Sequence, residues 1–246
     1  MTASGQPERE PSGTLAEPQV RDMFDRIAGM YDVLNQVMTA GLHHRWRSRA
    51  VQLAGVGRGS RVLDVATGTG DLAFALADAV GSDGAVVATD FSEKMLDIAR
   101  QKAIGRPDAG VVSFSTANAL ALPFGDSEFD AATVGFGVRN FSDLQRGLNE
   151  LARVVRPGGR VVILEMTTPV KPPLSTFFSL WFDRIVPVLG KVAGDSEAYT
   201  YLPNSVKRFP APDRLAAMMW ECGLRDVTYI LTAGGIIAMH AGTVPS

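Results

Sequence analysis

The stretch Val62-Leu63-Asp64-Val65-Ala66-Thr67-Gly68-Thr69-Gly70-Asp71 decides the fold. Its apolar first half predicts a buried β-strand over Arg61 to Ala66, and the residues from Asp71 to Ala79 predict an α-helix. The glycines between them permit positive φ angles and a close approach of the backbone to a ligand, and the start of the helix offers free N–H groups. A Gly-x-Gly turn alone also occurs as a simple tight turn, so the rest of the chain must decide whether a ligand binds here.

Short β-rich runs alternate with helical stretches after this turn. We predict further strands at Ala85–Thr89, Val111–Ser115, Phe129–Val134, Arg160–Leu164, Val227–Leu231 and Ile236–His240, and helices at Ser92–Ala103, Leu144–Val155 and Asp213–Cys222. This alternation predicts an α/β fold with a mostly parallel, seven-stranded sheet covered by helices on both faces. Ligands of such sheets bind beyond the carboxyl ends of the strands, so we expect the site in the loops after Ala66, Thr89, Ser115 and Val134.

The composition changes along the chain and divides it into parts. Residues 1–19 are rich in Pro, Glu, Ser and Gly and predict a disordered tail. The remainder, 20–246, predicts one domain made of N-terminal helices (20–59), a cofactor-binding core (60–168), a lid or substrate-binding insertion (169–212) and a C-terminal helix with two closing strands (213–246). The insertion is inferred because prolines and aromatic residues interrupt the α/β rhythm over a length unusual for a connection.

The composition also excludes several classes of protein. Of the 246 residues, 46% are hydrophobic, which excludes a disordered chain, and 24 Lys and Arg balance 26 Asp and Glu, so we expect no nucleic-acid partner. The single Cys222 excludes a disulfide framework, and no cluster of side chains has the spacing of metal ligands. No uncharged stretch approaches the roughly 18 to 20 residues of a membrane span, and the N-terminus lacks a secretory signal. We therefore expect a cytoplasmic protein without a metal ion.

An acidic residue follows the glycine turn at the distance typical of adenosine cofactors. Asp90 ends the second predicted strand, about 20 residues after the turn, where a carboxylate accepts hydrogen bonds from both ribose hydroxyls. We place Phe91 beside it in the same site. The alternative role of Asp90 is to cap the helix that begins at Ser92.

The residues after the turn disfavour a dinucleotide. A Gly-x-Gly-x-x-Gly pattern would place a third glycine where this chain has Ala73, and Asp71 would repel a pyrophosphate at the start of the helix. A negative charge there suits a ligand with a cationic centre and no phosphate, such as S-adenosylmethionine. Asp64 fits the same logic, although it could instead hydrogen-bond the loop backbone. An NAD-dependent oxidoreductase is accordingly the least favoured class.

Another pair of candidate residues follows the third predicted strand. An asparagine side chain both donates and accepts hydrogen bonds, so Asn118 can read the edge of an adenine while the N–H of Ala119 contacts a ring nitrogen. Asparagine is also common in turns, which is the alternative role of Asn118. Its position after a strand of the sheet favours the cofactor.

Together these residues resemble the ubiquinone/menaquinone biosynthesis C-methyltransferases. The resemblance covers nearly all of Val20 to Gly242 and rests on Tyr31-Asp32-x-x-Asn35, Asp64 to Asp71, Ala119-Leu120-Ala121-Leu122-Pro123-Phe124, Phe136-Gly137-Val138-Arg139-Asn140, Arg156-Pro157-Gly158-Gly159, Tyr199-Thr200-Tyr201-Leu202 and Gly235-Ile236-Ile237-Ala238-Met239-His240. It implies a Rossmann-like, class I S-adenosylmethionine-dependent methyltransferase. It also implies C-methylation of a polyprenylated quinol, with demethylmenaquinol as the favoured acceptor and the benzoquinol of ubiquinone synthesis as the other.

The resemblance places the cofactor contacts of the family on Thr69, Asp90, Asn118 and Ala119. A further family contact is a serine just before Phe-Gly-x-Arg-Asn, where this chain has Gly135, whose backbone could still serve. With the residues of the glycine turn, the expected cofactor site comprises Asp64, Thr67, Gly68, Thr69, Gly70, Asp90, Phe91, Asn118, Ala119 and Gly135.

Methyl transfer to a quinol ring requires an aligned ring carbon and an adjacent hydroxyl that ionises. Arg139, which follows the fourth predicted strand, is our candidate to stabilise that phenolate and hold a water, with Asn140 beside it. Proposals for the family give this pair a role in deprotonation, but a guanidinium stays protonated at neutral pH, so Arg139 is not a conventional base. Its alternative role is a salt bridge to a neighbouring acid.

Five further residues are candidates for the acceptor pocket, and ordinary packing is the alternative for each. They are Tyr31, Asp32 and Asn35 on the first predicted helix and Tyr199 and Tyr201 in the insertion. A histidine base would have to be His43, His44 or His240, and we expect a structural role for His240 at a strand end.

The lipophilic tail of such a substrate stays near a bilayer, which favours peripheral contact with the inner face of the membrane. Apolar residues of the insertion and residues of the second predicted helix could form the contacting surface. They are Phe177, Phe178, Leu180, Trp181, Phe182 and Ile185, with Arg45, Trp46, Arg47 and Arg49. The alternative for the aromatic residues is burial against the sheet.

Two rival functions are compatible with the sequence. One is a methyltransferase of the same fold that acts on a phenolic or polyketide secondary metabolite, and the other is a cofactor-binding scaffold without catalysis. The sequence does not separate naphthoquinol from benzoquinol acceptors. It also leaves open the length of the isoprenoid tail and the oligomeric state, a homodimer included.

Overall fold

The computed structural model describes residues 17–39, 41–169, 172–180 and 196–246. Most of the expected tail, residues 1–16, lies outside this part of the chain. The last three residues of that tail belong instead to the first helix, which begins at Glu17. The tail prediction is wrong for these three residues, because Glu17 contacts loops of the main body as described below.

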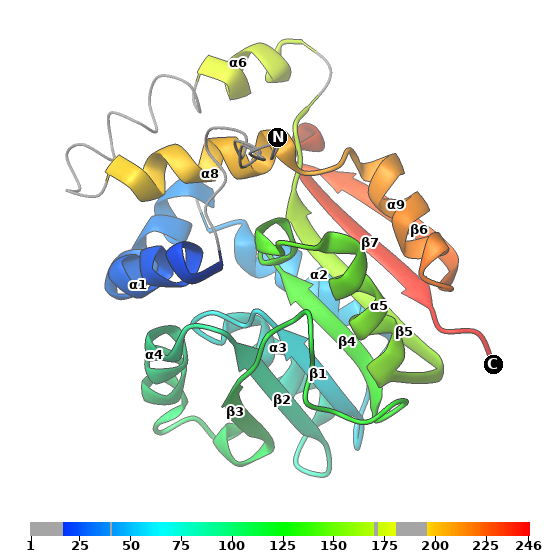
Figure 1. The fold of residues 1–246 in the computed structure, drawn as a ribbon. Coiled ribbons are helices and arrows are strands. Elements are labelled where there is room, and N and C mark those ends of the chain that lie inside the picture. The colour runs from blue at the N-terminus through cyan, green and yellow to red at the C-terminus, as the bar shows by residue number, and fades with distance from the viewer. Residues whose placement is uncertain (1–16, 40, 170–171, 181–195) are drawn as a thin grey trace, which may run out of the picture.

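Seven strands form one sheet within the described residues (Figure 1). They are β1 (Arg61–Val65), β2 (Ala85–Asp90), β3 (Val112–Thr116), β4 (Phe129–Gly135), β5 (Val155–Met166), β6 (Arg225–Thr232) and β7 (Ile237–Thr243). Their order in the sheet is β3-β2-β1-β4-β5-β7-β6. Strands β1, β2, β3, β4 and β5 are parallel to one another, and β7 pairs antiparallel with β5 and β6. The predicted α/β fold with a mostly parallel, seven-stranded sheet is therefore confirmed.

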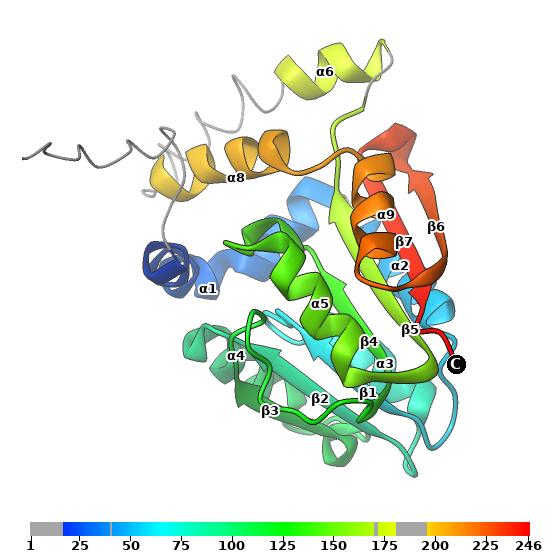
Figure 2. The same cartoon turned by 45° about the vertical axis from the view of Figure 1, so that its right-hand side comes forward.

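Helices cover both faces of the sheet and one of its ends. They are α1 (Glu17–Thr39), α2 (His43–Ala54), α3 (Asp71–Val80), α4 (Glu93–Ala103), α5 (Leu144–Val154), α6 (Leu174–Leu180), α8 (Ser196–Arg208) and α9 (Pro212–Glu221), with short 3-10 turns at Ala109–Val111, Val138–Asn140 and Ala233–Gly235. Helices α2 and α3 pack on one face, and α5 and α9 pack on the other. Helices α1 and α8 lie above the carboxyl ends of the parallel strands (Figures 1 and 2).

Local sequence signals explain where several helices begin. Ser92 caps α4, because its side chain accepts a hydrogen bond from the Met95 N–H at 3.2 Å. Asp143 caps α5 in the same way. Helix α9 begins at Pro212, one residue before the predicted start, because proline suits the first position of a helix, where its missing N–H costs nothing.

Strand β5 begins earlier than the sequence predicts, at Val155 instead of Arg160. Its register against β4 shifts over the Arg-Pro-Gly-Gly segment, which forms a bulge. Gly158 has a φ of +80°, and a Cβ on Gly159 would lie 2.5 Å from the carbonyl oxygen of Asp130. These glycines therefore let the strand continue through the bulge, where the sequence predicts a break between helix and strand.

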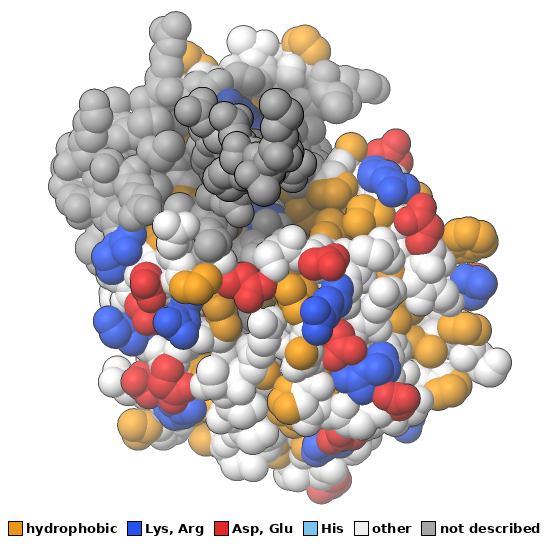
Figure 3. Space-filling model, viewed as in Figure 1, with side chains coloured by type: hydrophobic (Ala, Val, Ile, Leu, Met, Phe, Trp, Pro, Cys, Tyr) orange, Lys and Arg blue, Asp and Glu red, His pale blue; other side chains and the backbone are white. Residues whose placement is uncertain are grey.

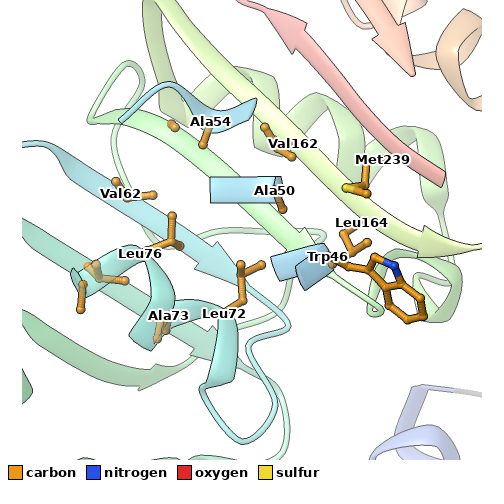
Figure 4. Close-up of a cluster of buried hydrophobic side chains, with 14 of the residues drawn as sticks. Trp46, Ala50, Ala54, Val62, Leu72, Ala73, Leu76, Val162, Leu164 and Met239 are labelled. Atoms are coloured by element: carbon orange, nitrogen blue, oxygen red, sulfur yellow. The ribbon is translucent and has the colours of Figure 1, made fainter. Parts of the chain in front are cut away.

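A hydrophobic cluster packs α2 and α3 against one face of the sheet (Figure 4). It contains Trp46, Ala50 and Ala54 of α2 together with Val62 of β1 and Leu164 of β5. Burial of each large apolar side chain stabilises the fold by roughly 1.5–3 kcal/mol. Trp46 is only 8% exposed, so its predicted place on a membrane-contacting surface is wrong.

The insertion packs on α1 through α6 and α8. Phe178 of α6 and Tyr201 of α8 are buried in one cluster with Val20 and Met23 of α1. The expected membrane-facing role of Phe178 is therefore wrong, because its ring is covered by neighbouring helices. These contacts hold the insertion above the carboxyl ends of the strands, where the site is expected.

The surface that we expected at a membrane is only partly described. Trp181, Phe182 and Ile185, and the side chain of Phe177, lie outside the described residues; Arg47 is buried; Leu180, Arg45 and Arg49 are exposed. No described helix combines the length and the hydropathy that a membrane span needs. Basic and acidic side chains are interspersed over the face seen in Figure 3.

Candidate active site

A pocket opens at the carboxyl ends of β1, β2, β3 and β4, next to α1. Figure 1 shows how these elements are arranged. It encloses about 1010 Å³, including its open mouth, and lies where the strand order reverses between β1 and β4. The expected site residues that line it are Tyr31, Asp64, Thr67, Gly68, Thr69, Asp90, Phe91, Asn118, Ala119, Gly135 and Asn140. The pocket is thus built by the four loops that the sequence predicts.

The glycine turn between β1 and α3 takes the conformation that its glycines permit. Gly68 and Gly70 have φ angles of +58° and +86°. A Cβ on Gly70 would lie 3.1 Å from the Cβ of Ala99 and from the ring of Phe74. Gly70 therefore shapes the turn without lining the pocket, and Gly68 lets the backbone approach a ligand.

Asp64 supports the glycine turn from below. Its carboxylate is fully buried and accepts hydrogen bonds from the hydroxyls of Thr67 and Thr133, both at 2.6 Å. Burial raises the pKa of Asp64 to about 6, although these two hydrogen bonds oppose the shift. The alternative role of Asp64 was a hydrogen bond to the loop backbone. The structure shows hydrogen bonds to side-chain hydroxyls instead, one of them from Thr67 in the loop.

Asp90 joins the glycine turn to the start of α4. Its Oδ2 accepts a hydrogen bond from the Gly68 N–H at 2.8 Å, and its Oδ1 accepts one from the Ser92 N–H at 2.9 Å. Burial raises the pKa of Asp90 to about 6 against the effect of these bonds. The Asp90 carboxylate also lines the pocket, where it can accept further hydrogen bonds from a ligand. The cap of α4 is Ser92, so Asp90 supports that helix only by binding the Ser92 N–H, and its contact with ribose stays a prediction.

Asn118 forms the turn that was its alternative role. Its Oδ1 accepts a hydrogen bond from the Leu120 N–H at 2.8 Å, and its Nδ2 donates to Glu17 Oε2 at 3.3 Å. The hydroxyl of Ser142 also donates to Glu17. Glu17 therefore ties the start of α1 to the loops after β3 and β4. We missed Glu17 because its segment has the composition of a disordered tail.

Asp32 lies in α1 and makes polar contacts outside that helix. Its Oδ1 accepts a hydrogen bond from the Thr69 hydroxyl at 2.6 Å, and its Oδ2 lies 3.0 Å from Lys102 Nζ. Asp32 does not line the pocket. The side chain ties α1 to the glycine turn and to α4, and its role at the acceptor stays a prediction.

Asp71 is neutralised by two cations at the start of α3. Arg47 Nη1 lies 2.9 Å from Asp71 Oδ2, and Lys102 contacts the other carboxylate oxygen. Burial would raise the pKa of Asp71, but the charges of Arg47 and Lys102 outweigh that effect and lower it. The argument that Asp71 repels a pyrophosphate therefore fails, because its charge is already compensated.

Arg139 makes the salt bridge that was its alternative role. Its Nη1 lies 2.7 Å from Glu165 Oε1 and donates to the Phe136 carbonyl, and its side chain is 7% exposed. The guanidinium does not line the pocket. The pairing with Glu165 is the contact that the structure shows, and a role of Arg139 at the acceptor stays a prediction. We missed Glu165, although its place near the end of β5 was a usable signal.

Asn140 is the member of the Arg-Asn pair that reaches the pocket. It lies in the 3-10 turn after β4, and its Oδ1 accepts a hydrogen bond from the Tyr201 hydroxyl at 3.1 Å. Burial raises the pKa of Tyr201, which keeps this hydroxyl protonated. Tyr201 thus contacts the site through Asn140 without lining the pocket itself.

The other acceptor candidates are described to different extents. Tyr31 lines the pocket, and its ring packs edge-on against Phe24 at a centroid distance of 6.2 Å. Asn35 lies in α1 and Tyr199 in α8, but their side chains lie outside the described residues. Among these three candidates, Tyr31 is the one whose side chain is described and lines the pocket.

Gly135, at the end of β4, lines the pocket close to Leu72. A Cβ added to Gly135 would lie 3.1 Å from Leu72 Cδ2, tighter than ordinary contact. The family serine would therefore require Leu72 to shift by a few tenths of an ångström. Gly135 and Leu72 fit each other, and the contact with the cofactor that we expected from the Gly135 backbone stays a prediction.

The histidines do not line the pocket. His43 Nδ1 lies 2.6 Å from the Thr39 hydroxyl, and His240 Nε2 lies 2.8 Å from the Pro212 carbonyl oxygen. Burial lowers the pKa of both rings. His240 thus has the structural role that we expected. Within the residues that the structure describes, no group of His, Cys, Asp and Glu could hold a metal ion.

The sheet order, the glycine turn after β1 and the acid that ends β2 define a class I methyltransferase that uses S-adenosylmethionine. Solved structures agree on the fold. A SAM-dependent methyltransferase from Aquifex aeolicus has a TM-score of 0.60 at 19% identity and covers 80% of this chain and 89% of its own. The [4+2]-cyclase SpnF has a TM-score of 0.69 at 18% identity, covering 94% and 98%.

Sequence comparison identifies the family. The model of the ubiE/COQ5 methyltransferase family matches residues 13–244. A demethylmenaquinone methyltransferase of Desulfitobacterium hafniense is 40% identical over 95% of this chain and 93% of the relative. The ubiquinone/menaquinone biosynthesis C-methyltransferase UbiE of Geobacter sulfurreducens is 42% identical over 91% and 88%. The chain belongs to the ubiE/COQ5 methyltransferase family.

The residues of the pocket fit S-adenosylmethionine, the methyl donor of this class. Gly68 offers a left-handed backbone for close approach, and the carboxylate of Asp90 keeps acceptor sites for ribose hydroxyls. Ala119 and Phe91 also line the pocket. These features agree with the cofactor assignment made from the sequence.

Proposed function

We propose that this protein methylates a ring carbon of a polyprenylated quinol, with demethylmenaquinol as the acceptor and menaquinol as the product. The reaction would be the last step of menaquinone biosynthesis, and the related benzoquinol is a second acceptor to be tested. The observation that carries the proposal is the near full-length similarity to a demethylmenaquinone methyltransferase. The pocket supports it, because the glycine turn and Asn140 line the same pocket.

The cofactor site is proposed at the pocket-lining residues Asp64, Thr67, Gly68, Thr69, Asp90, Phe91, Asn118, Ala119 and Gly135. When bound, S-adenosylmethionine supplies an electrophilic methyl group. The residues of the chain then bind and align the reactants, which is the main source of acceleration for such a transfer. Asp90 and the backbone of Gly68 hold the cofactor end of the pocket, and Asn140 and Tyr31 face the acceptor end.

Asn140 is proposed as the donor that orients the acceptor hydroxyl. Since its Oδ1 already accepts from Tyr201, its amide N–H groups remain to donate to an ionising quinol oxygen. Tyr201 is accordingly a positioning residue. The ring carbon would form the new bond with the methyl group as the bond between that methyl group and sulfur breaks and S-adenosylhomocysteine leaves. The ring carbon would then lose its proton to water, which restores the aromatic ring.

Arg139 is proposed to act through the same loop, not as a base. Burial alone would lower its pKa, but the adjacent Glu165 carboxylate raises it above its usual value. The guanidinium therefore stays protonated, and its pairing with Glu165 fixes the backbone that presents Asn140. A bound phenolate would still experience part of its positive charge.

We also propose peripheral contact with the inner face of the membrane, because the isoprenoid tail of the substrate favours the bilayer. Exposed Leu174 and Leu180 on α6 support it. Flotation with liposomes that contain anionic lipid tests it. The protein should float with the liposomes, and a Leu174→Asp, Leu180→Asp variant should stay behind; wild-type protein that stays in solution would exclude the contact.

Methyl transfer with several acceptors tests the proposed function. Reduced short-chain demethylmenaquinone, the matching benzoquinol and a soluble phenol are offered in parallel with labelled S-adenosylmethionine. We expect transfer to a quinol ring and a lower kcat for Tyr201→Phe with unchanged binding of S-adenosylhomocysteine. Transfer only to the soluble phenol would favour a secondary-metabolite methyltransferase, and binding without transfer to any acceptor would favour a scaffold.

A further inference from the structure

Arg47 is a buried cation at the edge of the cofactor pocket. Its side chain comes from α2, is 10% exposed and lines the pocket together with Thr69 and Asp71. Its Nη1 lies 2.9 Å from Asp71 Oδ2, but its N–H groups are not directed at that oxygen, so Nη1 forms no hydrogen bond with the described residues. A buried guanidinium nitrogen without a hydrogen-bond partner is costly, so Nη1 calls for a partner that the described residues do not supply.

The charges around Arg47 are balanced, and only one of the two cations faces the pocket. Asp71 contacts both Arg47 and Lys102, and Lys102 also contacts Asp32, so two cations meet two carboxylates. Lys102 does not line the pocket, whereas Arg47 does. Helix α3 begins at Asp71, and the positive end of its dipole adds to the attraction for a negative group. A ligand carboxylate would meet Arg47 and a helix N-terminus there, next to an Asp71 side chain whose charge Arg47 and Lys102 compensate.

We propose that Arg47 binds the carboxylate of the methionine part of the cofactor. The inference rests on the proposed cofactor site and adds to it a residue outside the four loops at the strand ends. S-adenosylmethionine and its product S-adenosylhomocysteine both carry this carboxylate at the opposite end from the adenine. Asp90 marks the ribose, so the pocket would hold the ligand between Asp90 and Arg47.

Binding of two ligands that differ only in this carboxylate tests the proposal. Isothermal titration gives the Kd of S-adenosylhomocysteine and of decarboxylated S-adenosylhomocysteine, which keeps the amino group. Loss of a charged hydrogen bond weakens binding by roughly 10- to 100-fold. Wild-type protein should prefer the carboxylate ligand by this factor. Arg47→Gln should lose the preference while it binds the decarboxylated ligand within about threefold of wild type.

Lys102→Gln is the matched control, because it also removes a cation that contacts Asp71 but leaves the pocket lining intact. It should keep the preference for the carboxylate ligand. The proposal is overturned if Arg47→Gln keeps the preference, or if Lys102→Gln loses it equally. Wild-type protein that binds neither ligand would instead contradict the cofactor site itself.

If the Arg47→Gln protein does not fold, a measurement on wild-type protein tests the proposal instead. In a crystal structure of wild-type protein with S-adenosylhomocysteine, a guanidinium nitrogen of Arg47 should lie within hydrogen-bonding distance of the ligand carboxylate. A carboxylate held by other groups, with Arg47 still directed at Asp71 alone, would disprove the inference.

Discussion

Asp64 and Asp90 illustrate how neighbouring acids in one pocket acquire different roles. Both are buried and burial raises the pKa of each to about 6. The Asp64 carboxylate accepts hydrogen bonds from the hydroxyls of Thr67 and Thr133. The Asp90 carboxylate accepts hydrogen bonds from backbone N–H groups, and we propose that it also accepts from a ribose. The partners of each carboxylate, more than its burial, decide which of them can serve the cofactor.

Cofactor affinity should depend on pH through Asp90. An ionised carboxylate accepts stronger hydrogen bonds from the ribose, and Asp90 becomes protonated as the pH falls through about 6. The Kd of S-adenosylhomocysteine should therefore rise by up to about tenfold per pH unit below 6. Titration calorimetry between pH 5 and pH 8 measures it.

Two asparagine variants identify the group responsible for this pH dependence. Asp90→Asn should bind more weakly at neutral pH and lose the dependence near pH 6, since no carboxyl remains to titrate at that site. Asp64→Asn should keep the dependence, because Asp90 is intact. A dependence that disappears in Asp64→Asn but persists in Asp90→Asn would reverse the assignment.

Arg139 and Glu165 should be strongly coupled in stability. Their side chains are 7% and 1% exposed, so either single truncation leaves an uncompensated buried charge, at a cost of about 3–5 kcal/mol. We expect Arg139→Met and Glu165→Leu each to lower the free energy of unfolding by this order, and the double variant to lose much less than the sum. Urea unfolding measures the cycle; additive losses would mean that the two side chains act independently.

At the scale of elements, α1 is attached to the pocket by three acidic side chains. Glu17 contacts Asn118 and Ser142, Asp25 accepts from the Ser92 hydroxyl at 2.5 Å, and Asp32 accepts from Thr69. These partners belong to the loops after β1, β2, β3 and β4. The helix therefore depends on the same loops that we propose for the cofactor, which couples its order to cofactor binding.

Removal of one attachment should loosen α1 without unfolding the protein. Asp32→Ala should increase amide hydrogen exchange across 17–39, while exchange in the central strands stays unchanged, because Asp32 is only partly buried. Asp22→Ala is the control on the same helix, since Asp22 is mostly exposed and lies 3.7 Å from Arg21. Equal exchange in both variants would show that the Asp32 contact does not hold the helix.

The sequence predicts elements better than it predicts side-chain partners. The spacing of apolar residues and the positions of glycines place the strands within a few residues. The sequence did not predict that Asp32 pairs with Lys102 or that the acid beside Arg139 is Glu165. These partners are 70 and 26 residues away in the chain. No local pattern encodes such distant pairs, because the packing of α1 and β5 brings them together.

At the scale of the whole molecule, the sheet order alone fixes where the site lies. The parallel strands β1 to β4 end at one edge, and α1, α6 and α8 cover that edge (Figures 1 and 2). The fold and the location of the pocket were therefore predictable from alternation and strand ends. The acceptor was not predictable in this way, because its choice depends on non-local contacts of the helices that cover this edge.

The central claim is that the pocket directs a methyl group to a quinol ring carbon. The most direct test uses S-adenosylmethionine with a deuterated methyl group, reduced short-chain demethylmenaquinone, and mass and NMR analysis of the product. We predict one deuterated methyl group on the ring carbon beside a hydroxyl, giving menaquinone after reoxidation. A methyl group on a quinol oxygen, or no transfer by protein that binds S-adenosylhomocysteine, would contradict the account.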